Sequence, residues 1–277
     1  MIQAATERHR EQFVIESDEG LPIRAVLEVP ARARALILVI HGFKGFKEWG
    51  FFPWLTDSLG DAGFAACRFD LSRNGVGEDP ETFERLDLFV DDTYSIQLAD
   101  LGAVERHLSA MPLTAQLPTF LLGHSRGGAV AILGASSAPR LKGVITWSAI
   151  STVDRWDEET RRRWRSEGRM EIVNQRTGQI MPLSTAVLDD LEANRSALDI
   201  HRALERLHVP ILVVHGTNDE SVPSDEAKSI AAAAPNSSLV LVEGGSHTFN
   251  AIHPLVHVPK ELRLVTDITT RFLSTYC

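Results

Sequence analysis

Short apolar runs alternate with longer stretches of helical periodicity along most of the chain. Continuous aliphatic runs of this kind are typical of strands that are buried on both faces of a sheet. Strands are predicted at Ala35–Ile40, Ala65–Leu71, Thr119–Leu122, Gly143–Ser148, Ile211–His215 and Leu239–Val242. Helices are predicted between them at Phe52–Ala62, Asp92–Ser109, Arg126–Ala135, Ser224–Ala234 and Lys260–Thr275. Strands that alternate with helices predict an α/β fold with a mostly parallel sheet and helices on both faces.

The first thirty residues follow a different pattern. Apolar and polar positions alternate in Glu11–Ser17 and again in Leu21–Val29, on either side of Asp18-Glu-Gly20. Two alternating runs around a short turn predict an antiparallel hairpin. With the six buried runs, this gives an eight-stranded sheet.

About sixty residues separate the strand that ends near Ser148 from the strand that begins at Ile211, too many for an ordinary crossover. A charged helix is expected within 154–168, where acidic residues at 157–159 precede arginines at 161–163 by four positions and favour helical ion pairs. A small hairpin around Asn174–Gly178 and a helix at Ser184–Ala193 follow. We expect one domain, 1–277, with a cap insertion at about 152–208 over the carboxyl ends of the strands.

Two groups of side chains near these segments have ordinary interpretations. Trp156 and Trp164 are expected to share a helix face and to pack the cap helix onto the body. Lys44, Lys47 and the Arg161–Arg169 cluster are interpreted as solvated surface charges rather than as a substrate site.

Composition narrows the class of protein. A formal net charge of −9 argues against a nucleic-acid partner. The only cysteines are Cys67 and Cys277, so a disulfide framework is not expected. The longest aliphatic run is much too short to span a bilayer, and the first ten residues are polar, without the apolar core of a signal peptide. We therefore expect a cytoplasmic protein with no membrane partner.

The strongest chemical motif is Gly123-His124-Ser125-Arg126-Gly127, directly after a buried strand and before a run of small and apolar residues. A serine at such a strand-to-helix turn is exposed above the sheet, and glycines two positions before and after it let the helix start close to the strand. Ser125 is therefore the candidate nucleophile.

A serine hydroxyl needs a base, and the base needs a carboxylate to orient it. In a parallel sheet such groups come from loops at the carboxyl ends of strands. Asp219 follows the strand at Ile211–His215, and His247 follows the last strand. Alternatives remain for each: Glu220 and Asp154 for the acid, and His253 and His257 for the base.

An oxyanion hole requires two backbone N–H groups. One is expected from Arg126, the residue after the nucleophile, and the other from Phe43 in the loop His41-Gly42-Phe43. His41 is interpreted as a structural, hydrogen-bonding histidine.

Together these motifs resemble those of the α/β-hydrolase superfamily over essentially the whole chain. The matching pieces are His41-Gly42-Phe43, Arg68-Phe69-Asp70, Gly123-His124-Ser125-Arg126-Gly127, His215-Gly216-Thr-Asn-Asp219 and Gly245-Ser246-His247. Within the superfamily the chain is similar to bacterial carboxylesterases of the cinnamoyl (feruloyl) type. The segment Leu71–Gly77 departs from the commoner Gly-x-Gly pattern, and we expect it to change the shape of that loop without loss of activity.

The resemblance implies nucleophile Ser125, acid Asp219, base His247, oxyanion donors Phe43 and Arg126, a compact cap, and no metal or organic cofactor. The hypothesis is a carboxylesterase that hydrolyses small or aromatic esters through an acyl-enzyme. Alternatives are a serine peptidase or amidase, a thioesterase, and a non-enzymatic small-molecule binding module. A homodimer is compatible with the sequence.

Overall fold

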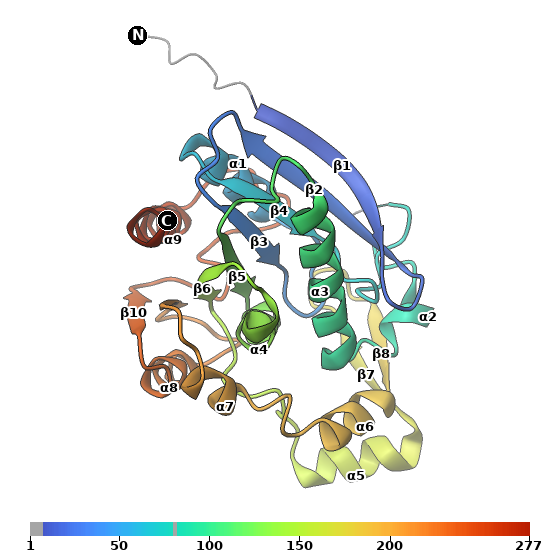
Figure 1. The fold of residues 1–277 in the computed structure, drawn as a ribbon. Coiled ribbons are helices and arrows are strands. Elements are labelled where there is room, and N and C mark those ends of the chain that lie inside the picture. The colour runs from blue at the N-terminus through green and yellow to red at the C-terminus, as the bar shows by residue number, and fades with distance from the viewer. Residues whose placement is uncertain (1–7, 80–81) are drawn as a thin grey trace.

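A central sheet organises the chain in the computed structural model, which describes residues 8–79 and 82–277. In these residues it has eight strands in the order β1-β2-β4-β3-β5-β6-β9-β10 (Figure 1). Their bounds are β1 Arg8–Glu16, β2 Pro22–Pro30, β3 Leu36–Ile40, β4 Ala65–Phe69, β5 Thr119–His124, β6 Leu141–Trp147, β9 Ile211–Gly216 and β10 Ser237–Val242. Only the β1–β2 and β2–β4 pairs of this sheet are antiparallel. The predicted mostly parallel sheet and its N-terminal hairpin are confirmed.

Helices cover both faces of the sheet. Helices α3 (Tyr94–Ala110), α4 (Arg126–Gly134) and α8 (Ser224–Ala233) pack on one face, and α1 (Phe52–Asp61) and α9 (Lys260–Tyr276) pack on the other (Figure 1). Alternate residues of β3 enter the two cores, with Leu38 in the first and Val39 in the second. This two-sided burial is the reason why β3 is aliphatic throughout. Among the described residues, no helix is both long and apolar enough to cross a membrane.

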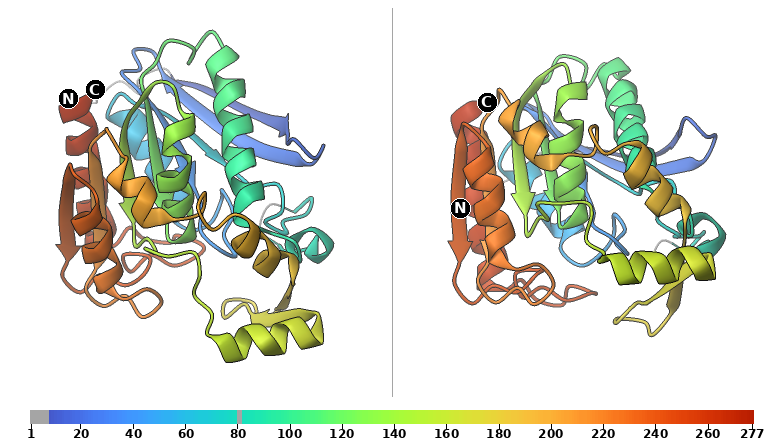
Figure 2. Two further views of the ribbon diagram at one scale, coloured as in Figure 1. Left: turned by 60° about the horizontal axis from the view of Figure 1, so that its bottom comes forward. Right: turned by 90° about the horizontal axis from the view of Figure 1, so that it is seen from below.

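The segment between β6 and β9 contains five further elements, which Figure 2 shows from two further directions. They are α5 Glu158–Glu167, β7 Arg169–Val173, β8 Ile180–Ser184, α6 Ala186–Ala193 and α7 Ile200–Glu205. The pair β7–β8 is the predicted antiparallel hairpin. Trp164, Met181 and Leu188 from this segment are buried in one cluster with Phe46 and Phe89, which follow β3 and β4 in the chain. These contacts attach α5 and the β7–β8 hairpin to the loops that follow the strands, whereas Ile200 and Leu204 of α7 pack into the core under α4.

The ion pairs predicted within α5 are wrong. The carboxylate of Asp157 caps the helix by accepting a hydrogen bond from the N–H of Thr160, so it lies outside the helical repeat. Arg161 instead pairs with Asp154 at 2.6 Å and with Glu192 at 3.4 Å. The late start of α5 also leaves Trp156 outside the helix, although its ring still meets that of Trp164 edge to face at 5.1 Å.

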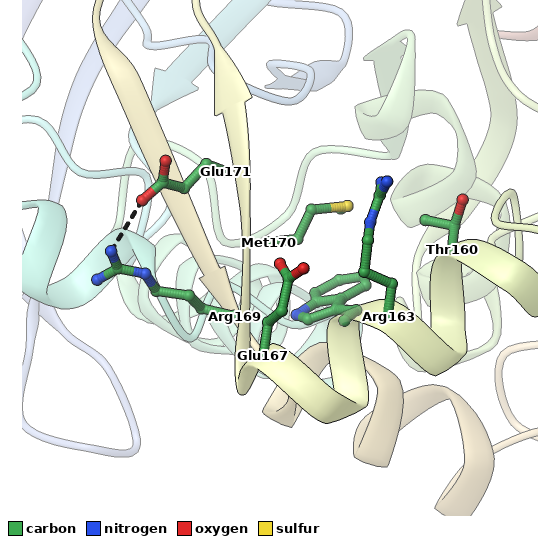
Figure 3. Close-up of a pocket in the computed structure, with 7 residues that line it drawn as sticks. Thr160, Arg163, Glu167, Arg169, Met170 and Glu171 are labelled. Carbon is green, nitrogen blue, oxygen red and sulfur yellow. Dashed lines mark ion pairs between the residues drawn. The ribbon is translucent and has the colours of Figure 1, made fainter.

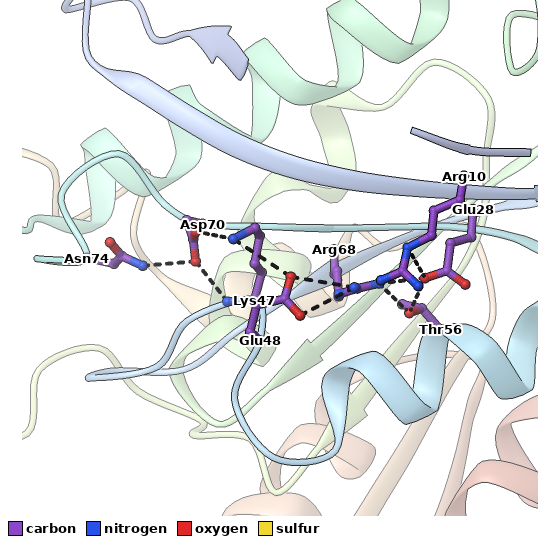
Figure 4. A network of polar contacts seen from close by, with 8 residues as sticks. All are labelled: Arg10, Glu28, Lys47, Glu48, Thr56, Arg68, Asp70 and Asn74. Carbon is purple, nitrogen blue, oxygen red and sulfur yellow. Dashed lines mark hydrogen bonds and ion pairs between the residues drawn. The ribbon is translucent and has the colours of Figure 1, made fainter. Parts of the chain in front are cut away.

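Lys47 is buried, which corrects its interpretation as a solvated charge. Its ammonium lies 3.0 Å from Asp70 Oδ2, and its backbone N–H donates to Asp70 Oδ1 at 2.8 Å. The amide of Asn74 donates to the same Oδ1 (Figure 4). The network continues through Arg68, which lies 2.7 Å from Glu28 and 3.3 Å from Glu48. These contacts fasten the loop after β3 to the end of β4.

Candidate active site

Ser125 occupies a strained turn between β5 and α4. Its φ of 57° and ψ of −122° are rarely adopted by a residue with a side chain. Backbone strain of this kind is found at nucleophile elbows, where the serine must project above the sheet. The turn is anchored because the Ser125 N–H donates to the carbonyl of Trp147 on β6 at 2.8 Å.

Asp219 and His247 meet although they come from loops after different strands. His247 Nδ1 lies 2.8 Å from Asp219 Oδ2, and the aspartate side chain is fully buried. Asp219 Oδ1 accepts hydrogen bonds from the N–H groups of Ser221 and Val222. Burial alone would raise the pKa of Asp219, but hydrogen bonds from His215, His247 and the backbone hold that pKa well below its ordinary value. The aspartate is therefore a carboxylate at neutral pH.

The loop that carries His247 is docked next to Ser125. His124, the residue before the serine, donates from Nε2 to the carbonyl of His247 at 2.9 Å. The rings of His124 and His247 lie 4.8 Å apart. Within the described chain the Ser125 hydroxyl makes no hydrogen bond to the His247 ring, and such bonds commonly tighten only around a bound substrate.

The loop after β3 passes directly over the serine. A side-chain carbon built on Gly42 would lie 3.0 Å from Ser125 Cβ and 3.1 Å from the His124 carbonyl oxygen, so any larger residue would press on the serine turn. In the described residues neither the Phe43 N–H nor the Arg126 N–H donates to another group of the protein. Two free N–H groups therefore flank the serine, as an oxyanion hole requires.

His41 has the predicted hydrogen-bonding role. Its Nδ1 donates to the carbonyl of Gly42 at 2.9 Å, and its Nε2 accepts from the N–H of Leu71 at 3.1 Å. Both ring nitrogens are thus used to hold the loop, and burial lowers the pKa of the ring. His41 is neutral at pH 7 and does not serve as a base.

The residues that the sequence offered as alternatives for the acid and the base lie in other environments. Asp154 pairs with Arg161 in the insertion, and Glu220 is exposed beside the buried Asp219. His253 accepts a hydrogen bond from the N–H of Gly50, and His257 is exposed.

Several polar side chains of this region were not found from the sequence. The Arg126 guanidinium is buried, donates to the carbonyl of Asp92 at 3.0 Å and lies over the ring of Tyr94. His124 and His215 contact His247 and Asp219 respectively. The only sequence signals are that His215 ends a predicted strand and that His124 stands next to Ser125 in the Gly-x-Ser-x-Gly motif.

A polar pocket of about 430 Å³ opens on the insertion, between α5 and β7. Arg163, Glu167 and Met170 stand around it in Figure 3, and an ion pair joins Arg169 to Glu171 at its rim. None of the predicted catalytic residues lines it. Within the part of the chain that the structure describes, no group of three or more His, Cys, Asp or Glu side chains is suited to a metal ion.

A serine at a strand-to-helix elbow in a sheet of this order is typical of the α/β hydrolases. The chain belongs to the Alpha/beta hydrolase family, whose sequence pattern matches residues 37–260.

Individual relatives are distant. The 2,6-dihydropseudooxynicotine hydrolase of Paenarthrobacter nicotinovorans is 24% identical over 255 aligned positions that cover 89% of this chain. The chain spans 60% of the length of that relative. Among solved structures, Est1E from Butyrivibrio proteoclasticus is 21% identical with a TM-score of 0.72, over 96% of this chain and 98% of Est1E. A dienelactone hydrolase from Anabaena variabilis is 17% identical with a TM-score of 0.65, over 97% and 98%. Likenesses at this identity establish the fold.

Proposed function

We propose that the protein is a serine carboxylic-ester hydrolase with Ser125 as nucleophile, His247 as base and Asp219 as the acid that orients the base. The observation that carries this proposal is the strained Ser125 backbone beside the buried Asp219–His247 pair. A strained elbow serine has no evident structural purpose, whereas it is what a nucleophile requires.

The reaction would proceed in two steps. His247 takes the proton from Ser125 Oγ as the oxygen attacks the ester carbonyl, and the N–H groups of Phe43 and Arg126 stabilise the oxyanion. His247 then gives its proton to the leaving alcohol. Water, activated by the same ring, attacks the acyl-enzyme, releases the acid and restores the serine. Asp219, held as a carboxylate, stabilises the imidazolium form of His247 in both steps.

Aromatic side chains next to the site support small or aromatic esters as substrates. Phe43, Trp49 and Trp156 are partly buried and pack on the cluster that joins the insertion to the loop after β3. Ferulic acid, an aromatic acid, is bound in a solved structure of Est1E. We propose that residues of about 152–208 form the cap that closes this apolar side of the substrate site, within one domain of residues 1–277. We also propose that the protein is located in the cytoplasm.

The test is ester turnover by wild type and Ser125→Ala. A series of nitrophenyl esters of graded acyl length and an aryl-acrylate ester should be hydrolysed by wild type, and the variant should lose at least about 10³-fold in kcat. Ser274→Ala, at an exposed serine on α9, is the matched control. An aminoacyl nitroanilide and a thioester run beside the esters decide between the ester hydrolase and the alternatives. Unchanged turnover by a folded Ser125→Ala variant would refute the assignment.

A further inference from the structure

A second histidine contacts the acid of the proposed catalytic set, at the same carboxylate oxygen as His247. We propose that His215 is a positioning residue, whose Nε2–H holds the Asp219 carboxylate in the orientation that receives His247. This inference rests on the proposed function, because it names what keeps the acid–base pair aligned.

The contact is short and wholly enclosed. His215 lies near the end of β9, and its side chain is 0% exposed. Its Nε2 lies 3.1 Å from Asp219 Oδ2 and 2.9 Å from the carbonyl oxygen of Val222. The ring therefore sits inside the turn 215–222 and joins the end of the strand to both the acid and the far end of the turn.

The surroundings determine where the ring proton is. Both groups that face Nε2 are oxygens that only accept hydrogen bonds, since Asp219 is a carboxylate. Nε2 must therefore carry the proton. Nδ1 is buried without a hydrogen-bond partner in the described residues, so a second proton there would be an unsatisfied buried donor. The ring is a neutral Nε2–H tautomer with its single donor aimed at the turn.

Hydrogen bonds to Asp219 show why this donor matters. Two backbone N–H groups donate to Oδ1, whereas the neighbours of Oδ2 are side chains. They are His247 Nδ1 at 2.8 Å and, at 3.1 Å, His215 Nε2, whose N–H is shared with the Val222 carbonyl. The Nδ1–H of His247 stays on the ring while Nε2 exchanges protons, so this hydrogen bond aligns the pair only when the carboxylate itself is held in place. His215 is not in the path of the proton and supplies that support.

The test compares two polar replacements of the same residue. Glutamine can place a donor at the reach of Nε2, whereas the shorter asparagine side chain reaches only the position of Nδ1. We expect His215→Asn to lower kcat for ester hydrolysis on the order of 10–100-fold, as is typical when a supporting hydrogen bond is lost, with KM within about twofold. His215→Gln should keep most of the wild-type kcat, and His208→Asn, at an exposed histidine, is the matched control.

The pH profile adds a readout that a purely structural role would not change. Titratable side chains in contact with His247 are Asp219 and His124, and only the support of Asp219 is altered in His215→Asn. A misaligned carboxylate stabilises the His247 imidazolium less, so the acidic limb of kcat/KM should move to lower pH in that variant.

Nitrogen NMR of the wild-type protein determines the tautomer of the His215 ring directly, and it does not depend on the folding of a variant. A neutral ring protonated on Nε2 is expected for His215, and a charged ring or an Nδ1–H tautomer would overturn the proposal. Equal kcat in His215→Asn and His215→Gln would overturn the proposal as well. If Ser125→Ala had lost its turnover at the same time, the proposed function would still stand. An ester hydrolase that does not depend on Ser125 would instead refute the proposed function itself.

Discussion

Two glycines beside Ser125 have no space for a side chain. A Cβ on Gly123 would lie 2.1 Å from the carbonyl oxygen of Gly127, and a Cβ on Gly127 would lie 2.4 Å from the carbonyl oxygen of Ile40. Both neighbours are backbone atoms of packed elements and cannot move aside. Helix α4 therefore starts against the ends of β3 and β5, and this close packing keeps Ser125 in its strained conformation.

We predict that Gly123→Ala lowers the free energy of unfolding by about 1–3 kcal/mol, the usual range for overpacking. The same change should reduce kcat, because the turn that presents Ser125 must shift. Urea denaturation with an ester assay measures both quantities. Gly102→Ala in α3 is the control, since the nearest atom to its added carbon is the end of the long Arg106 side chain, 3.3 Å away. Equal losses in the two variants would contradict this account of the elbow.

The positions of Ser125, Asp219 and His247 could be predicted because each follows a strand, and strand ends of a parallel sheet converge. Their chemical roles stay predictions until activity is measured. His215 could not be found in the same way. Its contact with Asp219 depends on how the turn 215–222 folds back on the strand, and no periodicity in the sequence encodes that geometry.

At the scale of elements, the loop after β3 is held by charge rather than by apolar packing alone. The Asp70 carboxylate at the end of β4 accepts from both the backbone and the ammonium of Lys47 (Figure 4). The loop carries Phe43, one of the proposed oxyanion donors. The position of that donor thus depends on a buried ion pair.

Removing one partner of this pair should be more harmful than removing both. Asp70→Ala leaves the buried Lys47 ammonium with only a longer contact of 3.8 Å to Glu48. We expect a loss of about 3–5 kcal/mol in the free energy of unfolding, as for other broken buried pairs. The double variant Lys47→Met/Asp70→Ala should lose less than Asp70→Ala alone. A double variant that is no more stable than the single one would show that the pair does not act as a unit.

The elements of the insertion were predictable, but their contacts were not. Turn residues around Asn174–Gly178 and the charged run before it were sufficient to predict the hairpin and α5. The spacing of charges then suggested partners inside the helix, whereas Arg161 reaches Asp154 and Glu192, which lie outside it. Local periodicity contains no information on such tertiary partners.

At the scale of the whole molecule, two buried histidines make stability depend on pH. Burial lowers the pKa of His41, and burial beside His247 lowers the pKa of His124 to about 3. In an unfolded chain a histidine titrates near pKa ~6.5. The unfolded state therefore binds more protons than the folded state below this pH. The stabilisation from each neutral ring is present above about pH 6.5 and falls as the pH is lowered below that value, for His124 down to about pH 3.

We predict that between pH 6.5 and 4 the wild type loses stability more steeply than His124→Gln, by about 1.4 kcal/mol per pH unit. Glutamine keeps a donor for the carbonyl of His247 and takes up no proton. Denaturant midpoints across the pH range provide the measurement. His208→Gln, at an exposed histidine, should follow the wild-type curve, and parallel curves for wild type and His124→Gln would contradict the prediction.

The most direct test of the central claim is to find which residue reacts with a fluorophosphonate probe. The account predicts one adduct per chain on the peptide that contains Ser125, formed by wild type and absent from Ser125→Ala. Mass spectrometry of the intact protein and of its peptides measures both the stoichiometry and the site. A wild-type protein that forms no adduct, or an adduct that persists in Ser125→Ala, would contradict the assignment of Ser125 as the nucleophile.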